Sequence, residues 1–125
     1  MSGTLTWASE LAGLASQALT GLEDVTVTAD LTEVPSALAG GHLVVAVRPP
    51  SLEVPGWREV IATWEVYLIA GPAEDQLSAW ERLDSALFHL LDALDADEVR
   101  PDAFTDLQNA TYPAFVLTTT SHHTR

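Results

Sequence analysis

The histidines are the first residues of this chain whose chemistry could build a metal or acid–base site. His42 begins an apolar run, His89 lies in a leucine-rich segment, and His122 and His123 are adjacent near the C-terminus. A zinc site needs several close nitrogen, sulfur or oxygen ligands, and no HExxH or comparable spacing occurs. The chain has no cysteine, which excludes thiolate catalysis, thiolate metal sites and disulfides. We therefore expect neither a metal ion nor a cofactor.

Motifs for nucleophilic catalysis and phosphate binding are also missing. No GxSxG segment surrounds a serine, and no serine stands in a recognised order with His and Asp. Gly40 and Gly41 lack the further glycines or the lysine of a phosphate-binding loop. Acidic residues are so frequent that no particular pair identifies a general acid and base. The sequence predicts that the protein is not an enzyme.

Length and composition predict one compact domain. The chain has 125 residues, of which 47% are hydrophobic, enough for a single core. We expect this domain to cover residues 1–120, followed by a frayed polar tail at 121–125. No uncharged apolar run approaches the 18 residues of a membrane-spanning helix, so we expect no membrane contact.

The charge of the chain is strongly one-sided. Eighteen acidic residues stand against five arginines and no lysine, which gives a formal net charge of −13. Such a chain repels phosphate backbones, so sequence-independent binding of nucleic acid is disfavoured. Two interpretations remain: the charge serves solubility, or it forms a surface that repels DNA or meets a basic partner.

Hydrophobic periodicity predicts the order helix, three strands, long helix, and one or two further strands. The strands each have one apolar face, which favours an α/β (α+β) fold. We expect a mostly antiparallel or mixed sheet of four to five strands, with the N-terminal helix and the long helix packed on one face. The predicted helices cover 4–20 and 72–94, and the strands cover 23–30, 42–48, 59–70 and 112–120, with 99–107 left open as an edge strand.

The third strand and the long helix form the expected scaffold. Alternation along 59–70 and helical spacing after Pro72 each give one apolar face. At about 1.5 Å per residue, the helix would be roughly 35 Å long and would cross the sheet. The residues expected to meet in the core are Trp64, Val66, Leu68, Trp80, Leu83 and Leu87.

A proline-rich segment before the third strand is a candidate contact surface. Residues 49–58, PPSLEVPGWR, begin with Pro49 and Pro50 and contain a third proline, which predicts a long structured loop and not a strand. The segment ends in Trp57 and Arg58, and both residue types are enriched at binding hot spots. In the alternative interpretation, Trp57 folds back onto the core.

Two further candidates for an interface follow from surface patterns. Glu65 and Tyr67 lie on the second face of the third strand, which is too mixed in polarity to indicate plain solvent exposure. Asp95, Asp97 and Glu98 follow the long helix, where negative charge opposes the helix dipole. Either a basic partner docks at this end or water solvates it.

Three segments of the chain carry a resemblance to a known family. They are HLVVAVRPPS, then TWEVYLIAGP followed by the AWERLDSALFHLLDAL helix, and YPAFVLTTT near the C-terminus. Together they cover roughly residues 40–120. In order and character they resemble the tail terminator proteins of long, non-contractile-tailed phages, especially those of actinobacterial hosts.

The resemblance implies a structural role in the virion. Such proteins assemble as rings, typically hexamers, at the head-proximal end of the tail tube, where they stop tube polymerisation and provide the surface that joins the head. The implied partners are further copies of this chain, the major tail tube protein and a neck or head-completion protein. Genomic DNA would pass through the lumen without specific binding.

Two alternatives remain beside this function. One is a head-closure or head–tail joining protein of the neck, which would use a similarly small domain. The other is an acidic DNA mimic that inhibits a DNA-binding protein, with carboxylates spaced along one face like phosphates. The acids of this chain are scattered over predicted loops, helix ends and strands, which argues against the mimic.

Overall fold

The fold is a mixed sheet of six strands covered by helices, as a computed structural model describes it for residues 3–71, 76–105 and 109–124. This confirms the predicted α+β class, with more strands than the four or five expected. The helical elements are α1 (Thr4–Ala18), the 3-10 helix η1 (Leu31–Glu33), α2 (Val34–Ala39) and α3 (Gln76–Leu94). The strands are β1 (Val25–Thr28), β2 (Leu43–Val47), β3 (Ser51–Gly56), β4 (Glu59–Ala70), β5 (Glu98–Thr105) and β6 (Thr111–Thr124).

The long strand β4 is the centre of the sheet. The strand order is β1-β2-β4-β6-β5, and β3 pairs with the part of β4 that β2 does not reach. β1 and β2 are parallel, whereas β2, β3 and β6 all run antiparallel to β4. β5 is antiparallel to β6 and forms the edge. The open segment 99–107 is therefore an edge strand over its described part, and residues 106–108 lie outside the description.

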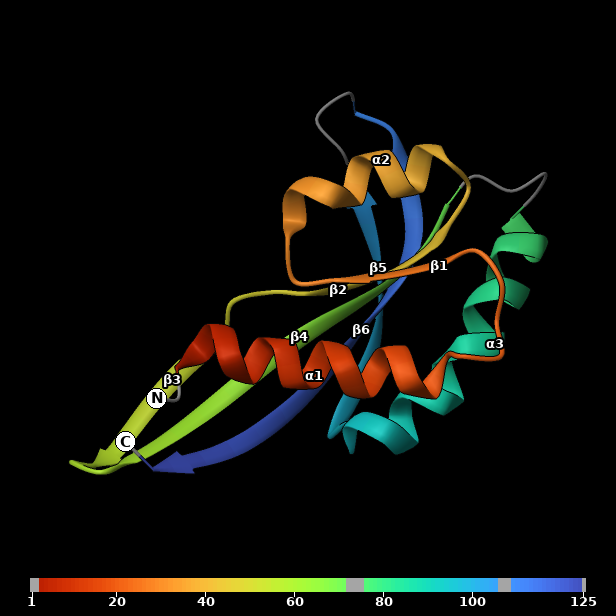
Figure 1. The fold of residues 1–125 in the computed structure, drawn as a ribbon. Helices are drawn as coiled ribbons and strands as arrows, with labels where there is room; N and C mark the ends of the chain where they lie inside the picture. Colours follow the sequence, from red (N-terminus) through yellow and green to blue (C-terminus); the bar gives the residue numbers. More distant parts are fainter. Residues whose placement is uncertain (1–2, 72–75, 106–108, 125) are drawn as a thin grey trace.

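The predicted alternation identifies one buried face of the sheet, but β2 is buried on both faces. On β2, Leu43, Val45 and Val47 join the cluster under α1 and α3, while Val44 and Ala46 face α2. Figure 1 shows α1 and α2 on opposite sides of this part of the sheet. The two predicted helices thus share one face, and α2 covers one end of the other.

Helix α3 buries a narrower stripe than the sequence predicts. The buried positions are Ala79, Leu83, Ala86, Leu87, Leu90 and Leu94. Leu77 and Trp80 lie outside this stripe and are 63% and 56% exposed. Trp80 was expected in the core, and that prediction is wrong because small Ala79 and Ala86 bring another side of the helix against the sheet. The expected helix start at Pro72 lies outside the described residues.

The segment 51–56, predicted as loop, is strand β3. It pairs with β4 from Ser51 to Glu53, and the register shifts between Glu53 and Gly56. Pro55 falls in this irregular stretch, where a missing N–H breaks no ladder bond. The prediction failed because proline excludes a residue from a regular central strand, but not from a bulged edge.

The C-terminal residues 121–124, predicted as a frayed tail, are also part of a strand. β6 continues to Thr124 and pairs with the start of β4. The indole N–H of Trp64 donates to Ser121 Oγ at 2.9 Å, and Ser121 Oγ is 2.7 Å from His123 Nε2. The His123 ring stacks on Trp7 with centroids 3.6 Å apart. These contacts tie the last strand to the first helix. Arg125 lies outside the described residues.

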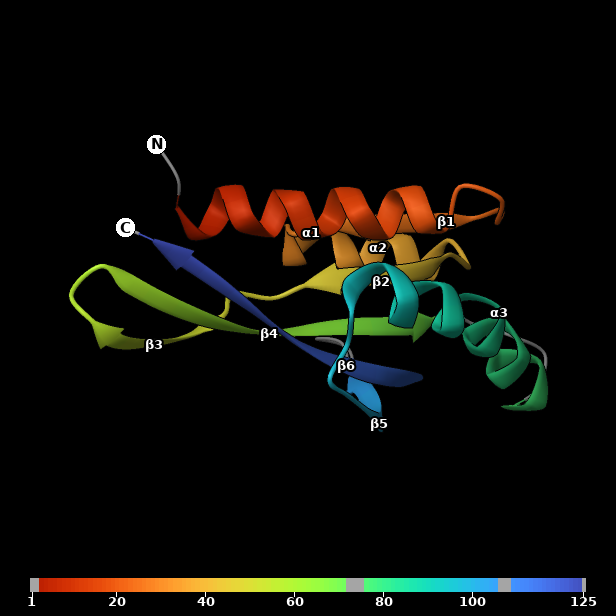
Figure 2. The ribbon, with the colours of Figure 1, turned by 90° about the horizontal axis from the view of Figure 1, so that it is seen from below.

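The hairpin of β3 and the start of β4 continues past the helices as a projecting arm. We define the arm as β3, the turn at 57–58 and residues 59–63 of β4. Figures 1 and 2 show it extending beyond the start of α1, with the turn between β3 and β4 at its tip. The other end of β4 leads to Gly71, whose backbone lies so close to a neighbouring segment that an added Cβ would be 2.7 Å from His42 O.

Candidate assembly interface

The tip of the arm carries the predicted hot-spot pair. Trp57 is 74% exposed and does not fold onto the core. The Arg58 guanidinium lies over the Trp57 ring, 4.4 Å from its centroid. Leu52 and Val54 on β3 are each 50% exposed. The tip therefore presents apolar side chains and one cation well away from the core, as contact surfaces do.

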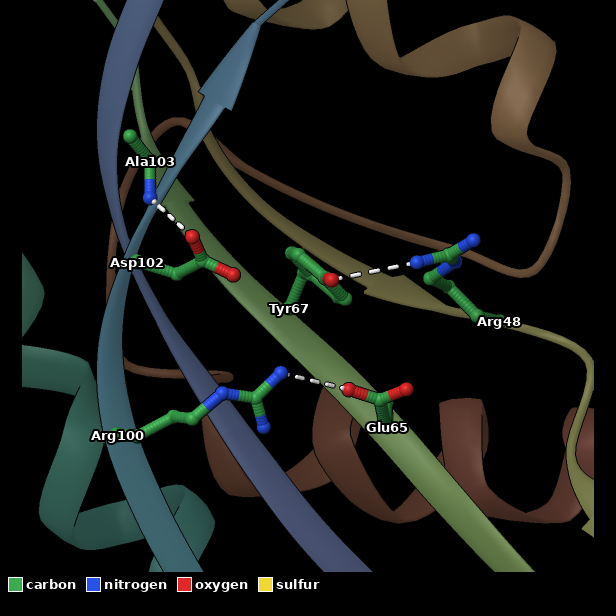
Figure 3. Close-up of polar contacts among 6 residues, drawn as sticks. All are labelled: Arg48, Glu65, Tyr67, Arg100, Asp102 and Ala103. Carbon is green, nitrogen blue, oxygen red and sulfur yellow. Dashed lines mark hydrogen bonds and ion pairs between the residues drawn. The ribbon is translucent and has the colours of Figure 1, made fainter.

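The outer face, the sheet surface lined by Ile61, Thr63, Glu65 and Tyr67, holds a polar network. Arg48 Nη1 donates to the Tyr67 hydroxyl at 3.2 Å, and its guanidinium lies 5.4 Å from the ring centroid. Figure 3 shows both side chains with Glu65 on this face. Beside them lies a cavity of about 280 Å³ whose apolar walls include Val34, Ile69 and Phe104.

An ion pair crosses the same face. Arg100 Nη2 donates to Glu65 Oε2 at 2.9 Å, and this hydrogen bond raises the pKa of Arg100 above its usual value. Both side chains are over 40% exposed, so the pair adds little to stability. Its effect is to fix two charges in place on β4 and β5 (Figure 3). The predicted residues Glu65 and Tyr67 thus lie in a network with two arginines that the sequence did not single out.

Hydrogen bonds satisfy backbone carbonyls at the C-terminal end of α3, although the acidic residues there oppose the helix dipole. Thr119 Oγ1 donates to Leu94 O at 2.8 Å, and Ala96 N donates to Leu91 O at 3.3 Å. Asp95 takes a left-handed conformation with φ 49°, a common way to end a helix. Asp97 N donates to Thr118 O at 2.7 Å, which leads the chain into β5. The side chains of Asp95, Asp97 and Glu98 are exposed.

The remaining predicted residues, Pro49 and Pro50, lie away from the arm tip. They connect β2 to β3 and line a hollow of about 100 Å³ with Leu5 and Ala8 of α1. The structure therefore separates the predicted residues into four places. These are the tip with Trp57 and Arg58, the outer face with Glu65 and Tyr67, the helix end, and this hollow.

An apolar groove that the sequence analysis missed lies where α3 meets the edge of the sheet. Its volume is about 460 Å³. We call it the α3 groove, and its lining residues are Trp80, Leu83, Pro101, Asp102, Pro113, Ala114 and Phe115. The register of β5 and β6 places Pro101 opposite Phe115 on the side of α3, whereas Asp102 and Ala114 lie opposite each other on the outer face. The unusual pair of prolines was visible in the sequence, but the register that aligns them was not.

Two absences concern the residues that the structure describes, 3–71, 76–105 and 109–124. No three His, Asp or Glu side chains among those residues gather as metal ligands would. None of the described helices has the length and low charge needed to span a bilayer. Neither a scan against protein-family models nor a search of curated proteins finds a match to this chain.

Proposed function

We propose that this protein is a tail terminator of a phage with a long, non-contractile tail. In this role it is a structural virion protein that forms a ring, a hexamer by the resemblance, at the head-proximal end of the tail tube. The ring stops tube polymerisation and offers a surface to the neck. Its partners are further copies of itself, the tail tube protein and a neck or head-completion protein.

The observation that carries the proposal is the projecting arm. Leu52 and Val54 on β3, and Trp57 in the turn after it, are at least half exposed in a hairpin that extends beyond the helices. In a lone monomer most of the Trp57 indole stays in water, whereas a subunit of an assembly can bury it against a neighbour. The three segments that resemble tail terminators supply β2, most of β4, α3 and much of β6, which form the sheet and helix from which the arm projects.

The charge of the chain supports a DNA conduit. A net charge of −13 on 125 residues repels the phosphate backbone of DNA passing through a lumen. The described arginines are engaged within the chain: Arg48 with Tyr67, Arg58 with Trp57, Arg82 with Gly41 O, and Arg100 with Glu65. These contacts leave acidic side chains to dominate the surface charge. A channel that must not bind the DNA passing through it requires such a surface.

Tail length in a deletion phage tests the function. We expect a phage that encodes this chain, once the coding region is deleted, to make tails that are longer and more variable than normal. Supplying the protein from a plasmid should restore a uniform length. Tails of normal length that lack heads would assign the protein to head–tail joining. Intact, infectious particles would contradict a structural role altogether.

A further inference from the structure

We propose that the cavity on the outer face binds a small organic acid, in which a carboxylate is joined to an apolar body. In this site Arg48 and Tyr67 hold the carboxylate, and the apolar walls hold the body. We call the site, with its volume of about 280 Å³, the outer-face cavity. The inference goes beyond the proposed ring, because this cavity is built from other residues than the arm tip.

The outer-face cavity has apolar walls that come from both strands and helices. They include Val34 of α2, Ala46 of β2, Ile69 of β4 and Phe104 of β5. Ala46 lies opposite Tyr67 in the register of β2 and β4, which places the phenol beside these walls. Typical ligand cavities measure about 300–1,000 Å³, so a cavity at the lower end of this range suits a small molecule.

Two polar side chains at the cavity have unused hydrogen-bond donors. Arg48 Nη1 donates to the Tyr67 hydroxyl at 3.2 Å, and the guanidinium lies 5.4 Å from the Tyr67 ring centroid. A guanidinium carries several N–H donors, and a phenol that accepts a hydrogen bond can still donate its own proton. Neither side chain donates to any further group among the residues that the structure describes. The cavity therefore combines apolar walls with donors that wait for an acceptor.

The acids on the outer face are engaged with other partners. Glu65 Oε2 accepts from Arg100 Nη2 at 2.9 Å, and Asp102 Oδ1 accepts from Ala103 N at 2.8 Å. Figure 3 shows both contacts beside Arg48. Over the described ranges, no carboxylate forms an ion pair with Arg48, although the chain has eighteen acidic residues. The two arginines and the two acids of this face balance in charge, so a further anion can approach.

This combination selects one chemical class of ligand. A carboxylate can accept two parallel N–H bonds from the planar guanidinium, and the Tyr67 hydroxyl can add a third. An apolar body attached to it leaves water and contacts Ile69 and Phe104. A neutral amide would lose the charge assistance, and an amine would be repelled by Arg48. The ligand is therefore a monocarboxylate with an apolar body.

Titration with benzoate, followed by NMR of the backbone amides, tests the site. We expect a dissociation constant of about 1 mM or tighter for a ligand of this size. The largest shift changes should occur at Ala46, Ile69 and Ala103, which line the cavity. Because the chain has a net charge of −13, non-specific binding of an anion is disfavoured. The absence of binding, or shift changes centred away from these residues, would overturn the proposal.

Two analogues of the same shape separate charge from apolar burial. Benzamide should bind at least about tenfold more weakly than benzoate, because it lacks the charge of the carboxylate. Benzylamine should cause no shift changes at the cavity. Equal binding of benzoate and benzamide would mean that the arginine does not recognise the ligand, which contradicts the proposal.

Side-chain variants assign the binding to the cavity. Arg48→Met keeps the apolar stem of the arginine and should weaken benzoate binding by about tenfold or more. Tyr67→Phe should weaken it by about threefold, the effect of one neutral donor. The matched control is Arg58→Met, which makes the same change of charge at the arm tip and should leave the affinity unchanged. If Arg58→Met weakens binding as much as Arg48→Met does, the effect is one of net charge and the site is refuted.

A final comparison separates this site from the proposed assembly. Trp57→Ala, which is expected to weaken self-association, should bind benzoate with the affinity of the wild type. A Trp57→Ala protein that no longer binds benzoate would place the ligand at an interface between copies and would overturn the assignment to the outer-face cavity. Loss of self-association with benzoate binding intact would support it.

Discussion

The hydroxyl of Thr119 donates a hydrogen bond to the backbone carbonyl of Leu94 across a distance of 2.8 Å. This bond joins the last turn of α3 to β6, and both residues are buried. Acidic residues at a helix C-terminus would leave that end less stable. Here the final carbonyl of the helix accepts a hydrogen bond from a donor in the sheet, which stabilises the end. The acids themselves remain in solvent.

Replacing Thr119 by valine should therefore destabilise the fold. Valine keeps the shape and the preference for a strand but leaves the Leu94 carbonyl without its donor. We expect the free energy of unfolding to fall by about 1–3 kcal/mol in urea denaturation. The matched control is Thr120→Val, one position along on the exposed side, which should change stability by less than about 0.5 kcal/mol. Equal effects of the two variants would contradict the role of this bond.

Ser121 should contribute to stability through the Trp64 indole. Trp64 is fully buried, and its N–H donates to Ser121 Oγ at 2.9 Å. Ser121→Ala leaves that donor without a partner, and we expect a loss of about 1–3 kcal/mol by thermal or urea unfolding. His122→Ala, an exposed neighbour on the same strand, is the control and should be nearly neutral. A neutral Ser121→Ala would show that 121–124 behave as the frayed tail predicted from sequence.

Two glycine-to-alanine substitutions should change the free energy of unfolding in opposite directions. A Cβ on Gly71 would lie 2.7 Å from His42 O and 3.0 Å from Leu38 O, so Gly71→Ala should cost about 1–3 kcal/mol. Gly13 lies within α1 with nothing within 4 Å of an added Cβ, so Gly13→Ala should stabilise by about 0.5–1 kcal/mol. The measurement is the urea midpoint of each variant. Stabilisation by Gly71→Ala would refute the close approach.

The stability contributed by Asp30 should depend on pH. Hydrogen bonds from the Thr32 side chain and backbone lower the pKa of Asp30 below its usual value of 3.8. Because the folded pKa is the lower one, this stability is present above pH 3.8 and is lost as the pH falls through the folded pKa. We expect wild type to be more stable than Asp30→Asn at pH 7 and the difference to vanish in strong acid. A pH-independent difference would contradict this.

Trp57 should matter for assembly and not for folding. Trp57→Ala removes a side chain that is 74% exposed, so the unfolding midpoint should stay within about 0.5 kcal/mol of wild type. Self-association, measured by sedimentation, should weaken by about 30-fold or more if Trp57 is a hot spot. The matched control is Leu14→Ala, which alters an exposed residue of α1 outside the arm tip and the α3 groove. A variant that unfolds more easily yet assembles normally would make Trp57 a folding residue.

Local patterns predicted the parts of the fold that depend on one element at a time. Alternation along β2 and β4 identified the face under α1 and α3, because a period of two places alternate side chains on one side. It did not predict the second buried face, where Val44, Ala46 and Ile69 pack under α2. The predicted number of strands was too low because β3 holds Pro55 in an irregular edge and carries a poor strand signal. The last strand was predicted too short because 121–124 is polar, although it pairs along the backbone of β4.

The candidate site was only partly predictable because it combines distant elements. Trp57 and Arg58 were identified as candidates from residue type alone. Their exposure follows from their place in the turn at the end of a hairpin. The α3 groove depends on the β5–β6 register, which places Pro101 opposite Phe115, and on the rotation of α3, which exposes Trp80. Neither the register nor the rotation is encoded in a local pattern.

Imaging of labelled virions tests the central claim most directly. An antibody against this chain, or a tag fused to it, should label one site per particle at the head-proximal end of the tail, and averaged images should show a ring there. Label along the whole tube, at the distal tip, or absent from purified virions would contradict the assignment of this protein as a tail terminator.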